Sequence, residues 1–178
     1  MTDIDTGNLG AIEGIMLAID IEKRGYNFYM EAAAVTEDPR GRAMFSRLAQ
    51  DEVRHLEWLT GHKGSLEKSG QWKDIVLSGK ALALGGLVFP KSAGPRSGAK
   101  GKTRELEALR RGIQAEKDSM ALYGSLAAKI DDVRGKNTFQ RLASEEEGHF
   151  HLLQAEHDYL SRSGFYFDMP EFSLEDLE

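Results

Sequence analysis

The sequence contains no cysteine. This absence excludes disulfides, thiolate-bound zinc, iron-sulfur clusters and a rubredoxin-type iron held by four cysteines. A metal site in this chain therefore has to use oxygen and imidazole ligands.

Basic stripes and long apolar runs are also lacking. The net charge is -6 with both signs mixed along the chain, so nucleic acid is not expected as a partner. Residues 75–89 are mostly apolar, but Lys80 interrupts them and the stretch is too short to span a bilayer. Residues 1–10 lack the basic and apolar regions of an export signal, so we expect a cytoplasmic location and no membrane partner.

Helical periodicity is present throughout the rest of the chain. Four stretches repeat apolar residues at three- and four-residue intervals, which predicts amphipathic helices over about 9–36, 39–69, 103–130 and 132–163. Residues suited to begin them are Asn8, the Asp38–Pro39 pair, Thr103 and the Asp131–Asp132 pair. With 178 residues, 40% of them apolar, we expect a single domain over 1–178, an all-α four-helix bundle.

One long link is expected, over about residues 70–102, and a tail over 164–178. Two short-turn helical hairpins joined by such a crossover place the third helix parallel to the second. For residues 75–89 we favour a short helix or extended crossover lying on the bundle, and a membrane-surface anchor is the alternative.

The two halves of the chain share a spaced set of residues, offset by 94 positions as from Glu22 to Glu116. The repeated identities include Glu22/Glu116, Tyr29/Tyr123, Phe45/Phe139, Arg47/Arg141, Leu48/Leu142, Ala49/Ala143, Glu52/Glu146 and His55/His149. These eight identities share one constant offset, with no insertion or deletion between them, which indicates a duplicated hairpin. A site built from them should therefore be nearly two-fold symmetric.

Six of these residues are Glu or His and fall on the inward-facing side of the helices. They are Glu22, Glu52, Glu116 and Glu146, with His55 and His149 one turn beyond two of them. Four buried carboxylates take up protons unless cations balance them, and two divalent ions balance four charges. The Glu and His of each Glu-x-x-His pair lie on one helix face and can bind the same ion. This ligand set is typical of di-iron and di-manganese carboxylate bundles, with zinc an open alternative.

Tyr29 and Tyr123 lie two turns after Glu22 and Glu116 on the same helix faces. Helical side chains lean toward the N-terminus, so each phenol should donate to the Glu of the facing helix. We interpret both as supports of the metal ligands, and two core tyrosines with unrelated acceptors are the alternative.

The other polar candidates are interpreted as surface groups. We expect His62, His151 and His157 at the surface or at helix ends. Carboxylates that flank the two motifs are Asp51, Glu57, Glu145 and Glu147. For these a solvated face is favoured over an iron entry route.

Over about residues 9–163, the pattern of Glu, Glu-x-x-His and Tyr in each half resembles the ferritin-like superfamily and, within it, the rubrerythrin-type proteins. The resemblance implies a ferritin-like bundle around a non-haem di-iron centre. Glu52 and Glu146 would bridge the irons, and Glu22, Glu116, His55 and His149 would each bind one.

Two departures from the rubrerythrin pattern bear on function. The chain has no cysteines for a rubredoxin domain, so electrons must come from an external donor, rubredoxin-like or other. Ser119 stands where the family usually has a further Glu one turn after the third-helix ligand. The ligand set of this chain is therefore the symmetric one, with four Glu and two His.

The resulting expectation is an oxidoreductase that reduces peroxide at two irons, as in oxidative-stress protection. A ferritin-type ferroxidase or iron-handling protein is the alternative, with dioxygen as the oxidant, and a non-enzymatic metal-binding or structural bundle is the third. We expect a homodimer, in which two chains could exchange hairpins.

Overall fold

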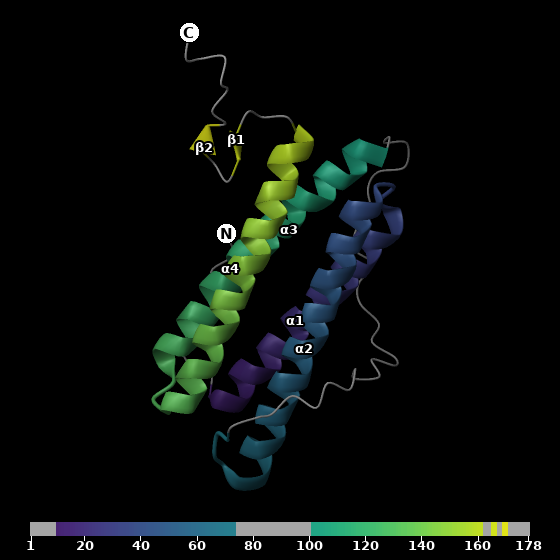
Figure 1. The fold of residues 1–178 in the computed structure, drawn as a ribbon. Helices are drawn as coiled ribbons and strands as arrows, with labels where there is room; N and C mark the ends of the chain where they lie inside the picture. The colour runs from purple at the N-terminus through teal and green to yellow at the C-terminus, as the bar shows by residue number, and fades with distance from the viewer. Residues whose placement is uncertain (1–9, 74–100, 162–164, 167–168, 171–178) are drawn as a thin grey trace.

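The computed structural model describes residues 10–73, 101–161, 165–166 and 169–170. Four helices account for nearly all of them, namely α1 (Ala11–Val35), α2 (Pro39–Ser69), α3 (Gly101–Lys129) and α4 (Val133–Ser161) (Figure 1). They confirm the predicted all-α four-helix bundle. After α4, β1 (Phe165–Tyr166) and β2 (Met169–Pro170) pair antiparallel in a very short hairpin.

Aspartate side chains cap the N-termini of α2 and α4. Asp38 accepts a hydrogen bond of 2.7 Å from the backbone nitrogen of Arg40, and Asp132 accepts one of 2.8 Å from that of Arg134. These bonds satisfy amide groups that the first turn of a helix leaves without an intrahelical partner. Both starts agree with the sequence prediction.

The start of α3 differs from the prediction. Thr103 was expected to cap this helix, but α3 already begins at Gly101, so Thr103 lies inside its first turn and the prediction is wrong. The expected cap Asn8, residues 75–89 and most of the crossover lie outside the described residues.

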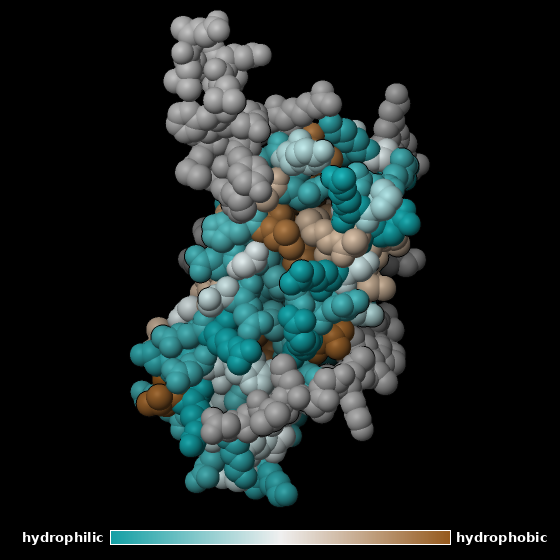
Figure 2. Space-filling view, viewed as in Figure 1, coloured by the Kyte–Doolittle hydropathy of each residue, from teal (hydrophilic) through white to brown (hydrophobic). Residues whose placement is uncertain are grey.

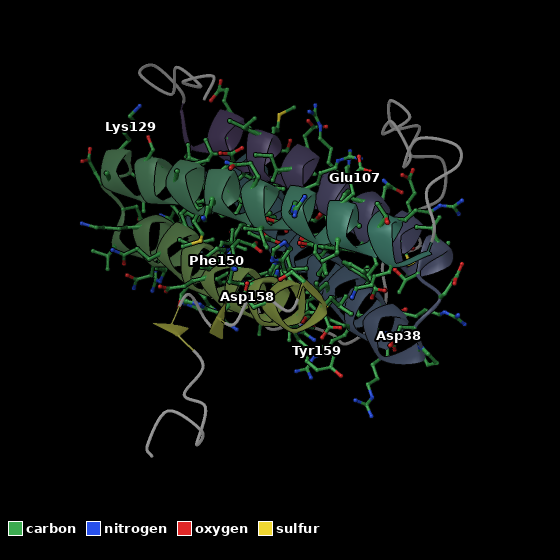
Figure 3. The ribbon with its side chains drawn as sticks, turned by 90° about the horizontal axis from the view of Figure 1, so that it is seen from above. Asp38, Glu107, Lys129, Phe150, Asp158 and Tyr159 are labelled. Carbon is green, nitrogen blue, oxygen red and sulfur yellow. The ribbon has the colours of Figure 1, made fainter. Side chains whose placement is uncertain are left out.

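The helices pack as two hairpins, α1 with α2 and α3 with α4, and contacts between α1 and α3 join them. Gly41 near the start of α2 packs against the carboxylate of Glu105 near the start of α3, so these two helices run parallel. Figure 3 shows the same arrangement, with Asp38 and Glu107 toward one end of the bundle and Lys129 at the other.

A polar layer divides the apolar core into two parts. The first core consists of Ile15, Ala18, Leu59, Leu66, Trp72, Leu122, Tyr123, Leu126, Ala127, Phe139 and Leu142. The second core consists of Tyr29, Ala32, Ala33, Phe45, Leu48, Ala49, Leu109 and Leu153. In every helix the predicted metal ligands fall between residues of these two cores, so apolar packing at both ends holds the polar layer in place.

The described part of the face drawn in Figure 2 is mainly hydrophilic. In Figure 2 hydrophilic side chains cover most of the visible face, and apolar ones form small separate groups. Among the described residues, no helix combines the length and apolar character needed to cross a membrane.

A close approach of α4 to Trp72 gives a test of the packing. A Cβ added at Gly135 would lie 2.5 Å from the Trp72 ring, whereas one added at Gly64 in α2 would meet nothing within 4 Å. Gly135→Ala is expected to lower the free energy of unfolding by about 1–3 kcal/mol through overpacking. Gly64→Ala should raise it by roughly 0.5–1 kcal/mol, because alanine is the better helix residue. Urea unfolding of both variants checks the opposite signs.

The buried Glu105 predicts a pH effect on stability. Burial, followed by the negative charges of Glu156 and Asp38, raises the pKa of this carboxyl. The folded state therefore holds the proton at a pH where the unfolded state has lost it. Stability from this group is full below its unfolded pKa and is lost as pH rises through the folded pKa.

We therefore expect Glu105→Gln to raise the free energy of unfolding at neutral pH and to have little effect in acid. The gain is up to about 1.4 kcal/mol for each unit of pKa shift. Glu107→Gln, on the exposed side of the same helix (Figure 3), is the matched control and should show no such pH-dependent gain. Equal behaviour of the two variants in urea unfolding at several pH values would contradict this account.

Candidate metal centre

The polar layer brings together all six ligands predicted from the sequence. Glu22 comes from α1, Glu52 and His55 from α2, Glu116 from α3, and Glu146 and His149 from α4. None of them is more than 7% exposed. Six ionisable side chains thus share one region from which water is largely excluded.

These residues form two overlapping groups. One consists of Glu22, Glu52, His55 and Glu146, and the other of Glu116, Glu146, His149 and Glu52. Within each group, one candidate ligand atom per residue lies within 4.8 Å of all the others. Glu52 and Glu146 belong to both groups, and the offset of 94 positions converts one group into the other. The two-fold symmetry expected from the repeat is therefore present in the layout.

Both imidazoles point Nδ1 into the layer. His55 Nδ1 lies 3.0 Å from Glu22 Oε2 and 3.2 Å from Glu146 Oε1. His149 Nδ1 lies 2.8 Å from Glu146 Oε2 and 3.6 Å from Glu116 Oε1. The two rings stack with centroids 5.6 Å apart. Nδ1 is thus the nitrogen that each histidine directs toward the carboxylates of the layer.

The opposite ring nitrogens face carboxylates that sequence reasoning had assigned to a solvated face. His55 Nε2 lies 3.0 Å from Glu145 Oε2, and His149 Nε2 lies 3.6 Å from Asp51 Oδ2. Asp51 is buried and Glu145 half-buried, so that assignment is wrong for these two. The repeat does contain a signal for these two, because Asp51 and Glu145 are also 94 positions apart and both are acidic. Since they are different residue types, they do not appear among the repeated identities. Glu147 is exposed, as expected.

Arginines support these outer carboxylates. Arg141 Nε lies 2.8 Å from Glu145 Oε1, and Arg54 lies 2.5 Å from Asp51. The hydrogen bond with His55 lowers the pKa of Glu145 to about 2, against the opposing effect of burial and with help from Arg141. Glu145 is thus a carboxylate at any ordinary pH and accepts a hydrogen bond from Nε2 of His55.

The two tyrosines link the hairpins. Tyr29 donates a hydrogen bond to Glu116, and Tyr123 donates one to Glu22. Each bond joins a phenol of one hairpin to a carboxylate of the other, as the spacing predicts. Both rings are buried, so these donors have a fixed position beside the carboxylates.

Without cations, the cluster offsets its charge with protons. Burial, with the charges of Glu22 and Glu146 added, raises the pKa of Glu52 well above its usual range, and burial raises that of Glu116 to about 7. Burial opposes charge on His149, but its close approaches to the carboxylates of Asp51, Glu116 and Glu146 outweigh this and raise its pKa to about 12. The layer therefore needs positive charge, which either protons or metal ions supply.

Several atoms fit a metal better than a proton network. Both carboxylate oxygens of Glu146 and Nδ1 of His149 are buried, and within the described part of the chain they have no partner in hydrogen-bond geometry. Gly25 leaves space beside Glu52, where an added Cβ would lie 3.0 Å from the carboxylate carbon. Oxygen and imidazole donors at this density suit iron, manganese or zinc.

One further histidine differs from the prediction. His62 is buried and not at the surface, with Nε2 3.2 Å from Thr138 Oγ1 and its ring beside Trp58 and Trp72. Trp72, which follows the end of α2, covers this face of the helix. His151 is exposed and His157 is partly exposed near the end of α4, as expected.

The fold and the site define this protein as an all-α four-helix bundle with a buried layer of carboxylates and imidazoles between two apolar cores. No protein-family model matches the chain, and no curated protein matches it. Two solved structures resemble it in fold.

The first is a hypothetical protein from Pyrococcus furiosus, with 22% identity and a TM-score of 0.66 over 91% of this chain and 97% of that one. The second is a two-domain protein from Anabaena variabilis that contains DJ-1/ThiJ/PfpI-like and ferritin-like domains. It has 14% identity and a TM-score of 0.60 over 93% of this chain, which spans 44% of the Anabaena protein. At these identities the similarity concerns the fold alone.

Proposed function

We propose that the polar layer binds two iron ions and that the protein reduces peroxide there. The observation that carries this proposal is the pair of overlapping ligand groups that share Glu52 and Glu146. Four carboxylates and two neutral imidazoles balance two divalent cations without leaving net charge in the buried layer.

In this proposal each residue has a distinct task. Glu22 and His55 would hold one ion, Glu116 and His149 would hold the other, and Glu52 and Glu146 would contribute to both. Iron, when bound, supplies the two-electron redox chemistry. Tyr29 and Tyr123 orient the outer oxygens of Glu116 and Glu22 by hydrogen bonding. The two apolar cores exclude water from the ends of the layer that face along the bundle.

The electrons come from outside the chain. Reduction of hydrogen peroxide to two waters consumes two electrons and two protons, and this sequence has no cysteine-based redox group to provide electrons. An external donor is therefore part of the proposed reaction.

The proposal is tested by loading the metal-free chain with Fe²⁺ under anaerobic conditions and mixing it with hydrogen peroxide or with dioxygen. We expect two ions per chain and faster oxidation by peroxide. Faster oxidation by dioxygen with release of ferric iron would favour the ferroxidase alternative. Absence of bound iron after loading would overturn both.

A further inference from the structure

A cavity of about 440 Å³ lies between α1 and α3 and reaches the polar layer. Glu22, Glu52, Glu116 and Glu146 form its inner end, together with Tyr29. Small residues of the two helices leave this space unfilled, namely Gly25 on α1 and Ala115 and Ser119 on α3. It thus leads directly to the carboxylates proposed to hold the metals.

The cavity is much larger than peroxide or dioxygen needs. A water molecule accounts for roughly 30 Å³ of liquid, and a closed apolar cavity of about 150 Å³ holds benzene. A space nearly three times that size has room for a molecule of one or two fused rings. Its volume also falls within the range of about 300–1,000 Å³ typical of sites for small organic ligands.

The walls are mainly apolar, and Ile21, Phe28 and Leu122 contribute to them. Four exposed residues of the lining are charged. Two are positive, Arg24 and Arg111, and two are negative, Glu31 and Asp118. The four exposed charges sum to zero, so they favour neither sign of ligand, and any ionic ligand would lose hydration against the apolar walls. The lining therefore suits an uncharged molecule.

We propose that this cavity binds a neutral, mostly apolar organic molecule of one or two rings, placed beside the metal centre as a second substrate. The binding step depends on the cavity walls and not on the metal. Only the description of the molecule as a substrate rests on the proposed function.

The probe is 1-naphthol, which is neutral at pH 7, compared with 1-naphthoate and 1-naphthylmethylammonium. Each is titrated into the full chain before and after iron loading, followed by calorimetry and by the methyl NMR signals of Ile21 and Leu122. We expect saturable binding of the neutral probe with Kd below about 1 mM in both forms and weaker binding of the two ions.

Two alanines on α3 give a matched pair of variants. Both are exposed, but Ala115 lines the cavity and Ala121 does not. Ala115→Trp should weaken naphthol binding at least about tenfold, equal to 1.4 kcal/mol, and Ala121→Trp should leave it unchanged. Ser119→Leu fills the same space and serves as a second variant if Ala115→Trp does not fold.

Absence of saturable naphthol binding, equal loss in the Ala115 and Ala121 variants, or equal affinity for the three probes would overturn the inference. The test is separate from that of the proposed function. A chain that binds naphthol but not iron would support the cavity site and contradict the metal centre. A chain that binds iron but not naphthol would support the metal centre and contradict the cavity site.

Discussion

Glu146→Ala is expected to reduce iron binding from two ions per chain to less than one. Glu146 belongs to both groups of candidate ligands, so in the proposed centre its loss would remove an oxygen from each ion at once. It would also leave His55 and His149 without the carboxylate that lies within 3.2 Å and 2.8 Å of their Nδ1 atoms. We expect affinity to fall by more than about 100-fold, the upper end for groups that only support ligands. Anaerobic titration with Fe²⁺ and metal analysis after gel filtration measure the change.

Glu147→Ala is the matched control. Glu147 is the next residue on α4, carries the same side chain and is exposed, so its replacement should leave two ions bound. Circular dichroism of the metal-free Glu146→Ala variant should retain the helical signal, because both apolar cores remain intact. Two ions bound to a folded Glu146→Ala variant would contradict the shared role of this residue.

The sequence was sufficient to predict the helices and the six side chains that meet in the polar layer, for the same physical reason. Helical periodicity fixes which side chains face inward, and Glu22 or Glu52 at such a position has no apolar explanation. The offset of 94 positions then relates each of these residues in the first half of the chain to its counterpart in the second half. Both conclusions depend on spacing within one helix, which the sequence records directly.

Features that depend on neighbouring helices were less accessible. His62 looked like a surface residue because its burial comes from Thr138 on α4 and from Trp72 after the helix end. Asp51 and Glu145 lie beside the inward seam, and only the packing of α2 against α4 brings each to a histidine of the other helix. The cavity likewise results from small residues on two separate helices, of which neither helix alone gives a signal.

The repeat also predicts near symmetry, and the structure shows where it is incomplete. Glu145 reaches His55 Nε2 at 3.0 Å, whereas Asp51, shorter by one methylene, approaches His149 Nε2 only to 3.6 Å. The first separation has hydrogen-bond length and the second exceeds it. The two halves of the centre should therefore differ in how firmly each histidine is held.

Removal of the outer carboxylates is expected to distinguish the two ions. Glu145→Ala takes away the acceptor that orients His55, so the ion held by Glu22 and His55 should bind about 10–100-fold more weakly. Asp51→Ala should weaken the ion at His149 by a smaller factor, because its contact is longer. Competition with a coloured Fe²⁺ chelator measures both dissociation constants. Equal weakening of both ions in each variant would show that these carboxylates do not act through individual histidines, and unchanged binding would show that neither one supports the centre.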